Sequence, residues 1–223
     1  MKITLKDGSV KEYESKKSII DIAKDISEGL ARNVVAGEVN GVMHDLRDEI
    51  EADCELNLIT LKDKEALSVI RHSASHVLAE AVKRVFPEAK LAIGPSIAEG
   101  FYYDFDHEPF SREDLDKLEA EMKKIIKEGA HIEKFELPRQ EAIKFMEEKN
   151  EPYKVELIKD LPEGEKISFY KQGGFTDLCA GPHLQRTKDI KAFKLISSSM
   201  AYWRGDSNKA KLQRIYGTAY NTS

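Results

Sequence analysis

The 223-residue sequence has only two cysteines, Cys54 and Cys179, and no long apolar run. Two cysteines cannot supply the bridges that hold small secreted domains together, and a membrane-spanning helix needs roughly 20 apolar residues. The first ten residues, MKITLKDGSV, also lack the apolar stretch of a secretory signal. These absences exclude a disulfide-stapled scaffold and a transmembrane protein, and they favour a cytoplasmic location.

Several common catalytic signatures are also missing. The sequence contains no P-loop, no dinucleotide-binding glycine fingerprint and no G-x-S-x-G elbow. Hydrophobic residues nevertheless make up 41% of the chain and charged residues 34%, which is typical of a chain that packs a core. The length suits one large domain or two smaller ones.

The charge is unevenly distributed, although its net value is only −5. The stretch 186–214 carries +6, so the remainder carries −11. Such a block could bind a polyanion, or it could be a set of solvated strand edges. Its basic residues are Arg186, Lys188, Lys191, Lys194, Arg204, Lys209, Lys211 and Arg214.

The sequence pattern of the first 60 residues predicts a small α+β unit. Asp7-Gly8 and Asn40-Gly41 are hairpin turn signals, and Cys54, Leu56 and Leu58 alternate as a final strand. A helix is expected from Ser18, which forms a capping-box pattern with Asp21, to Gly29. The unit contains no cluster of titratable groups, so we expect it to be dispensable for chemistry. The charged segment 61–64 is the predicted linker.

The remainder predicts helices packed on a mainly antiparallel sheet. Helical periodicity or capping signals mark three segments: 64–86, 111–129 and 139–149. The expected strands are 101–105, 167–170, 175–179, 193–199, 201–204 and 212–216.

Two residue pairs are candidate catalytic or metal-binding groups. His72 and His76 are four residues apart on a predicted helix, which places both imidazoles on one face, away from the apolar stripe. Cys179 and His183 flank a Gly-Pro turn that could bring thiol and imidazole together. Three histidines and a cysteine can supply the four ligands of a tetrahedral zinc site. The same residues could instead orient a water molecule and transfer protons. The helix lacks the glutamate of H-E-x-x-H, which disfavours a zincin protease.

Five motifs then identify a family. The sequence resembles the N-terminal region of bacterial-type threonyl-tRNA synthetases in the segments His72–His76, Ile93–Pro95, Gly100–Asp104, Thr176–His183 and Ile215–Ala219. The resemblance implies a TGS domain with a ubiquitin-like β-grasp fold over residues 1–62. It implies a larger α/β editing domain over residues 63–223, of the kind shared with alanyl-tRNA synthetase editing modules.

The resemblance also implies a reaction and a partner. The family's editing domain hydrolyses the ester of mischarged seryl-tRNA(Thr), so the expected partner is the acceptor end of tRNA(Thr) carrying serine. Serine lacks one methyl group of threonine, and a synthetic pocket gains only ~1–3 kcal/mol of discrimination from it. A second, hydrolytic site therefore makes physical sense. The class II aminoacylation core and anticodon-binding domain of the family are missing from this sequence, so we expect no ligase activity from it.

Carried over residue by residue, the family's catalytic set falls on His72, His76, Lys154, Asp177, Cys179 and His183. We expect His72 to orient or deprotonate water, Asp177 to hold the serine amine, and Lys154 to stabilise negative charge or anchor the ribose. Tyr102, Tyr103 and Asp104 either line the pocket or pack within a strand. The basic block 186–214 is the candidate RNA-binding surface.

No cofactor is expected, with zinc on His72, His76, Cys179 and His183 as the alternative. A metal held by all four would leave no open position for water, which a catalytic zinc requires. Two other readings remain: a zinc-dependent alanyl-tRNA-type deacylase, and a non-catalytic RNA-binding module.

Overall fold

The first unit is built on the two predicted hairpins, whose turns carry glycine at positive φ. Gly8 (φ 89°) and Gly41 (φ 83°) adopt a backbone conformation that residues with a Cβ rarely reach. The computed structural model describes residues 1–222. The strands of this unit are β1 Lys2–Leu5, β2 Val10–Glu12, β3 Lys17–Ser18, β4 Val34–Val39, β5 Val42–His44, β6 Glu49–Ile50 and β7 Cys54–Thr60.

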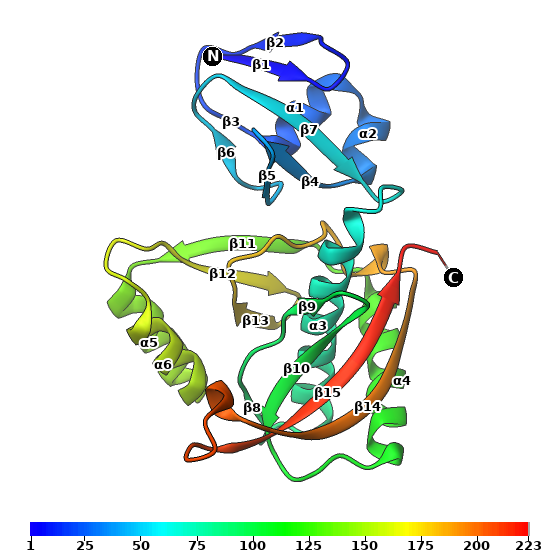
Figure 1. Cartoon of the computed structure of the whole chain (residues 1–223), viewed down its shortest axis with the longest axis vertical. Helices are drawn as coiled ribbons and strands as arrows, with labels where there is room; N and C mark the ends of the chain where they lie inside the picture. Colours follow the sequence, from blue (N-terminus) through cyan, green and yellow to red (C-terminus); the bar gives the residue numbers. More distant parts are fainter. Residues whose placement is uncertain (223) are drawn as a thin grey trace.

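The five main strands form a sheet in the order β2-β1-β7-β4-β5, with β1 parallel to β7. Helix α1, Ile19–Ile26, begins where the sequence predicts, and the Ser18 hydroxyl accepts a hydrogen bond from the Asp21 N–H. Ile19 and Ile22 are buried in the core of this unit. The arrangement is the expected β-grasp-like fold (Figure 1).

The expectation of one helix running to Gly29 is wrong. Ser27 has extended backbone (φ −166°), which ends α1 and starts a second helix, α2, Glu28–Asn33. The Ser27 hydroxyl accepts a hydrogen bond from the Leu30 N–H, so it caps α2. Gly29 therefore lies inside a helix.

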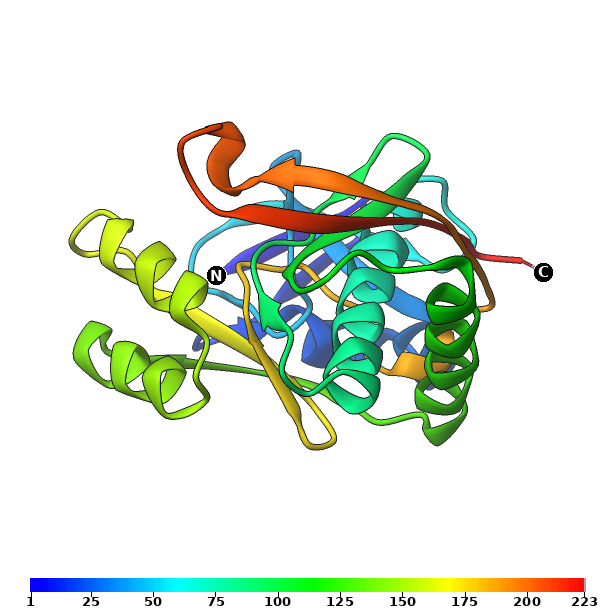
Figure 2. The same ribbon diagram turned by 90° about the horizontal axis from the view of Figure 1, so that it is seen from below.

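The second unit contains two sheets, each covered by a helix pair. The antiparallel sheet β14-β15-β10-β8 packs against α3 and α4, which lie side by side along the long strands (Figure 2). The sheet β11-β12-β13 packs against α5 and α6. The helices are α3 Ala66–Val85, α4 Arg112–Glu128, α5 Arg139–Glu148 and α6 Pro152–Asp160. The strands are β8 Lys90–Leu91, β9 Ser96–Ile97, β10 Gly100–Asp106, β11 Ile132–Leu137, β12 Ile167–Gln172, β13 Phe175–Leu178, β14 Ala192–Tyr202 and β15 Lys211–Tyr220.

Most predicted elements are present. The sequence pattern does not predict strands β8, β9 and β11 or helix α6, although Pro152 at the first position of α6 is a typical helix start. The two strands expected at 193–199 and 201–204 are one strand, β14, which bulges between Leu195 and Ser197 and ends in a short 3-10 turn. None of the helices in residues 1–222 combines the length and apolar character of a membrane span.

We propose that the boundary between the two units lies at residues 62/63, as the sequence predicts. The chain leaves β7 at Thr60 and turns before α3 begins at Ala66. The units nevertheless share a packed contact, because Val35, Ala36 and Ile59 join the large core of the second unit.

Candidate active site

Helix α3 carries both histidines of the first predicted pair, and the face that bears them is covered. Gln172 of β12 reaches this helix, and its amide donates a hydrogen bond to Glu80 at 2.9 Å. His76 is consequently buried, while His72 is partly exposed. The sequence pattern marks the apolar stripe of α3, but it contains no sign that a second sheet packs on the opposite face.

The two predicted pairs converge on one point. The candidate ligand atoms of His72, His76, Cys179 and His183 all lie within 4.8 Å of one another. Cys179 Sγ is 3.3 Å from His72 Nε2 and 3.2 Å from His183 Nε2. The His183 ring centroid lies 4.2 Å from each of the other two imidazole centroids.

The loop after β13 turns at Gly181, so that the Cys179 thiol and the His183 imidazole face each other. Gly181 has φ +77°, and a Cβ on it would come within 2.0 Å of the Tyr170 hydroxyl, so no larger residue fits. Its N–H donates to Cys179 Sγ at 3.2 Å. His72 Nδ1 lies 3.2 Å from the Pro182 carbonyl oxygen. Because a carbonyl only accepts, Nδ1 of His72 carries the proton and Nε2 keeps a lone pair.

A buried ion pair lies beside this cluster. Lys154 Nζ is 3.0 Å from Asp177 Oδ1, and their side chains are 3% and 1% exposed. The Tyr103 hydroxyl donates to Asp177 Oδ2 at 2.6 Å, and His76 Nε2 lies 3.6 Å from the same oxygen. Asp177 Oδ1 makes no hydrogen bond of good geometry with any described residue, so it keeps acceptor capacity.

Burial sets the protonation of the cluster. It lowers the pKa of His72, lowers that of His76 to about 3, and holds that of His183 well below its ordinary value. Burial also raises the pKa of the Cys179 thiol to about 12. Burial by itself raises the pKa of the Asp177 carboxyl, but the Lys154 ammonium and the hydrogen bond from the Tyr103 hydroxyl act together against it, and the pKa is lowered. At neutral pH the site therefore holds neutral imidazoles, a protonated thiol and one matched ion pair.

The four clustered residues also suit a zinc ion. Three imidazoles and a thiol are appropriate donors, and Nδ1 of His72 and of His183 have partners, Pro182 O and Ser73 Oγ, that would orient the rings. A zinc bound by all four side chains would be coordinatively closed. Its contribution would be structural.

A shallow cleft of about 280 Å³ opens onto these groups. The Ile93–Pro95 loop and Leu157 form its apolar wall, and His72, Lys154 and Asp177 are among its polar lining. The Ser75 hydroxyl lies 2.8 Å from the Gly94 carbonyl oxygen and ties this loop to α3.

Two of the three predicted substrate-binding residues lie elsewhere. Tyr103 belongs to the site through its hydrogen bond to Asp177. Tyr102 and Asp104 alternate to the other face of β10, where both contact Arg214. The Asp104 carboxylate accepts two hydrogen bonds from that guanidinium, at 2.8 and 3.0 Å. Their contacts are those of strand packing, the other role considered for them.

The basic block does not form one compact patch. Lys188 and Lys191 precede β14, whereas Lys209 and Lys211 lie at the far end of the β14–β15 ribbon. Four members are ion-paired: Arg186 with Asp189, Lys194 with Glu119, Arg204 with Asp160 and Arg214 with Asp104. Within residues 1–222, the other four make no ion pair.

Sequence reasoning missed three residues that support the site. Ser73 lies within the His72–His76 motif, and its Oγ is 3.0 Å from His183 Nδ1. The sequence pattern predicts Tyr170 only as the end of a strand, and no motif includes Asp45. The position of Ser73 between the histidines was a usable signal, whereas the contacts of Tyr170 and Asp45 are long-range.

Two stretches of the chain match known domain families. Residues 1–60 match the TGS domain, and residues 167–216 match the threonyl and alanyl tRNA synthetase second additional domain. The chain thus joins a TGS domain to a domain of the tRNA synthetase editing type.

Whole proteins similar to the chain are threonine–tRNA ligases. It is 63% identical over 221 residues to that of Acetivibrio thermocellus, and 62% identical over 221 residues to that of Clostridioides difficile strain 630. Each match covers 99% of this chain and 35% of the relative, so the chain spans about a third of the length of these proteins. The resemblance to the N-terminal region of threonyl-tRNA synthetases is therefore confirmed.

Proposed function

We propose that this chain hydrolyses the ester bond of seryl-tRNA(Thr). The observation that carries the proposal is the neutral His/Cys cluster beside the buried Lys154–Asp177 pair at one small cleft. Ester hydrolysis requires an oriented water, a proton acceptor and a positive charge near the developing oxyanion. The cleft provides a candidate for each.

His72 is the best proton acceptor of the cluster. It is partly exposed at the cleft, and burial keeps its imidazole neutral at pH 7. Its Nδ1–H is held by the Pro182 carbonyl, which fixes the ring and leaves Nε2 basic. His76, Cys179 and His183 pack around that ring and hold its orientation.

Asp177 and Lys154 interact with groups of opposite charge on the substrate. The open acceptor capacity of Asp177 Oδ1 suits the α-ammonium group of the aminoacyl ester. Lys154 also lines the cleft, and its ammonium can stabilise an oxyanion there. Tyr103 keeps the Asp177 carboxylate in place.

The small cleft suits a small aminoacyl group. We propose that it accepts serine and excludes the additional methyl group of threonine. The partner is the acceptor end of tRNA(Thr) carrying serine, and part of the basic block contacts its phosphates. The ligase activity named for the relatives is not proposed for this chain, which spans about a third of their length.

No metal is assigned to the reaction. If zinc is bound, His72, His76, Cys179 and His183 hold it, and it supplies folding energy. The second candidate, a zinc-dependent alanyl-tRNA-type deacylase, depends on the same four donors.

The proposal is tested by incubating the purified chain with seryl-, threonyl- and alanyl-tRNA(Thr) in parallel and measuring the ester remaining. We expect seryl-tRNA(Thr) to be hydrolysed and threonyl-tRNA(Thr) to be largely spared. Equal hydrolysis of seryl and threonyl esters would contradict the selectivity. RNA binding with no hydrolysis of any ester would favour the RNA-binding module.

A further inference from the structure

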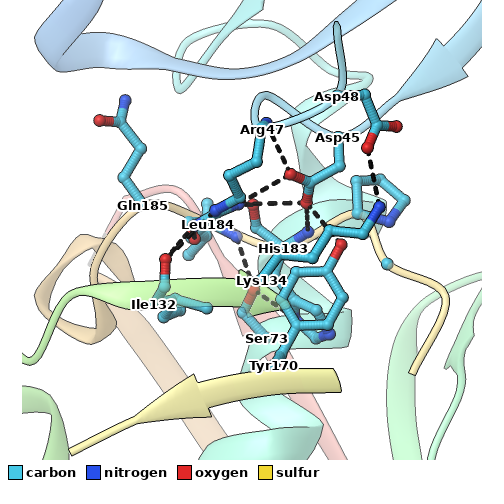
Figure 3. Close-up of polar contacts among 12 residues, drawn as sticks. Asp45, Arg47, Asp48, Ser73, Ile132, Lys134, Tyr170, His183, Leu184 and Gln185 are labelled. Atoms are coloured by element: carbon cyan, nitrogen blue, oxygen red, sulfur yellow. Dashed lines mark hydrogen bonds and ion pairs between the residues drawn. The ribbon is translucent and has the colours of Figure 1, made fainter. Parts of the chain in front are cut away.

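A loop of the TGS domain reaches the active-site segment of the second domain. The loop Asp45–Asp48 lies between β5 and β6, and the segment His183–Arg186 follows the Gly-Pro turn (Figure 3). The two stretches are separated by more than a hundred residues in sequence but are joined by direct hydrogen bonds.

The Asp45 carboxylate accepts two hydrogen bonds from the second domain. Its Oδ2 accepts from the His183 backbone N–H at 3.0 Å and from the Tyr170 hydroxyl at 2.9 Å. The side chain is only 1% exposed. Figure 3 shows the carboxylate directed from the first domain toward these two donors.

Arg47 holds the carbonyl groups of the same region. Its guanidinium donates to the carbonyl oxygens of His183 at 2.9 Å, Leu184 at 2.6 Å and Ile132 at 2.6 Å. It also pairs with Asp45 at 3.1 Å, which matches the buried charge of that carboxylate. The planar guanidinium has five donors, so one side chain can fix several acceptors at once.

The hydrogen bonds made by Asp45 constrain Tyr170 and His183, and these two residues contact the His/Cys cluster. Tyr170 packs its hydroxyl against Gly181, where no Cβ could fit, and Gly181 donates its N–H to Cys179 Sγ. His183 places Nε2 3.2 Å from the same sulfur. Through Tyr170 and His183, the Asp45 carboxylate therefore constrains both the Gly181 turn and the imidazole that contact the Cys179 thiol.

We propose that Asp45 and Arg47 of the TGS domain are positioning residues for the deacylation site. They fix the backbone that carries His183 and the Gly181 turn, so the site is complete only when the first domain is seated. The inference rests on the proposed function of the cluster. It replaces the expectation from sequence that residues 1–62 are dispensable for the chemistry.

The neighbouring Asp48 provides a matched control. Its carboxylate pairs with Lys134 across the same domain contact, at 2.7 Å, but bonds neither His183 nor Tyr170. Asp48→Asn and Asp45→Asn are the same chemical change, three residues apart. Only the second removes a group that holds the active-site segment.

The experiment measures single-turnover hydrolysis of seryl-tRNA(Thr) by the full chain and by the Asp45→Asn, Arg47→Lys and Asp48→Asn variants. Because small misplacements of catalytic groups are costly, we expect the maximal rate of the first two to fall by about 10- to 100-fold. Affinity for tRNA should stay within about twofold, as expected when positioning rather than binding is lost. Asp48→Asn should match the parent.

Histidine ring NMR of the same four proteins reports on the site without relying on activity. We expect the His183 ring resonances to move in Asp45→Asn and in Arg47→Lys, and to stay fixed in Asp48→Asn. If Asp45→Asn does not fold, Arg47→Lys decides the question alone. Parent-like rates and ring resonances in the folded variants would overturn the inference, and so would an equal loss in Asp48→Asn. A parent that hydrolyses nothing would instead refute the proposed function, and the ring resonances would still decide whether these residues position His183.

Discussion

Lys154 and Asp177 form an ion pair with almost no access to water, with Nζ 3.0 Å from Oδ1. Removing one member of such a pair leaves an uncompensated buried charge, which costs about 3–5 kcal/mol. The Lys154 ammonium also counteracts the effect of burial on Asp177 and lowers the pKa of its carboxyl. The pair therefore links the stability of the second domain to the electrostatics of its cleft.

We expect Asp177→Asn and Lys154→Met each to lower the free energy of unfolding by about 3–5 kcal/mol, because each leaves the other residue's charge buried and uncompensated. The double variant, which buries no charge, should be more stable than either single variant. Urea unfolding of all four proteins measures the cycle. Additive losses in the double variant would show that the pair is not coupled.

The buried histidines predict a loss of stability in acid. Their pKa values lie below the ordinary value near 6.5, with His76 at about 3, so the unfolded chain takes up protons more readily. The stability that depends on neutral imidazoles is complete above about pH 6.5 and is lost as the pH falls below it. For His76, whose pKa is about 3, the loss approaches about 1.4 kcal/mol per pH unit.

Unfolding free energies measured between pH 7 and pH 5 test this. We expect a steep decline in the parent and a shallower one in His76→Gln, which lacks one of these groups. His44→Gln, which removes a histidine outside the cluster, should decline as the parent does. A stability that does not change over this range would contradict the burial of neutral imidazoles.

We expect the chain to contain well under one zinc per molecule and to keep its activity after prolonged chelation. A zinc held by all four donors would have no position left for water, so the proposed hydrolysis does not depend on a metal. Elemental analysis of protein purified without chelators is the measurement. Near-stoichiometric zinc, with folding and activity both lost on its removal, would favour the alanyl-type deacylase.

Lys209 and Lys211, which make no ion pair within residues 1–222, should contribute to tRNA affinity. We expect Lys209→Ala combined with Lys211→Ala to weaken binding and to reduce the slope of log affinity against log salt by about 2, which is about 1 per lost phosphate contact. Lys123→Ala combined with Lys127→Ala on α4 removes the same charge outside the block. Equal effects of the two pairs would mean that net charge, and not a local contact, is being measured.

Local signals predicted much of this molecule, and long-range contacts explain what was missed. The sequence predicts the turns at Gly8 and Gly41 because a tight turn needs positive φ, and α4 lies within the predicted helical segment 111–129. The spacing of His72 and His76 required them to share a helix face. Their meeting with Cys179 depends on the packing of α3 against the loop after β13, and was inferred only from residue types and resemblance.

The positions of Lys154 and Asp45 show where sequence reasoning ends. Lys154 was proposed from resemblance alone, since helix α6, which carries it, was not predicted. A lysine is rarely buried without a partner, and that partner, Asp177, is distant in sequence. Asp45 follows an ordinary strand, and no periodicity or spacing relates it to His183.

The most direct test is the single-turnover rate of seryl-tRNA(Thr) hydrolysis by His72→Ala compared with the parent. A positioned proton acceptor contributes about 10²–10⁴-fold, so we expect a loss of at least about 100-fold with a cooperative thermal melt retained. His131→Ala, an exposed histidine outside the cluster, should keep the parental rate. A folded His72→Ala protein that hydrolyses the ester at the parental rate would contradict the assignment of this cluster as the active site.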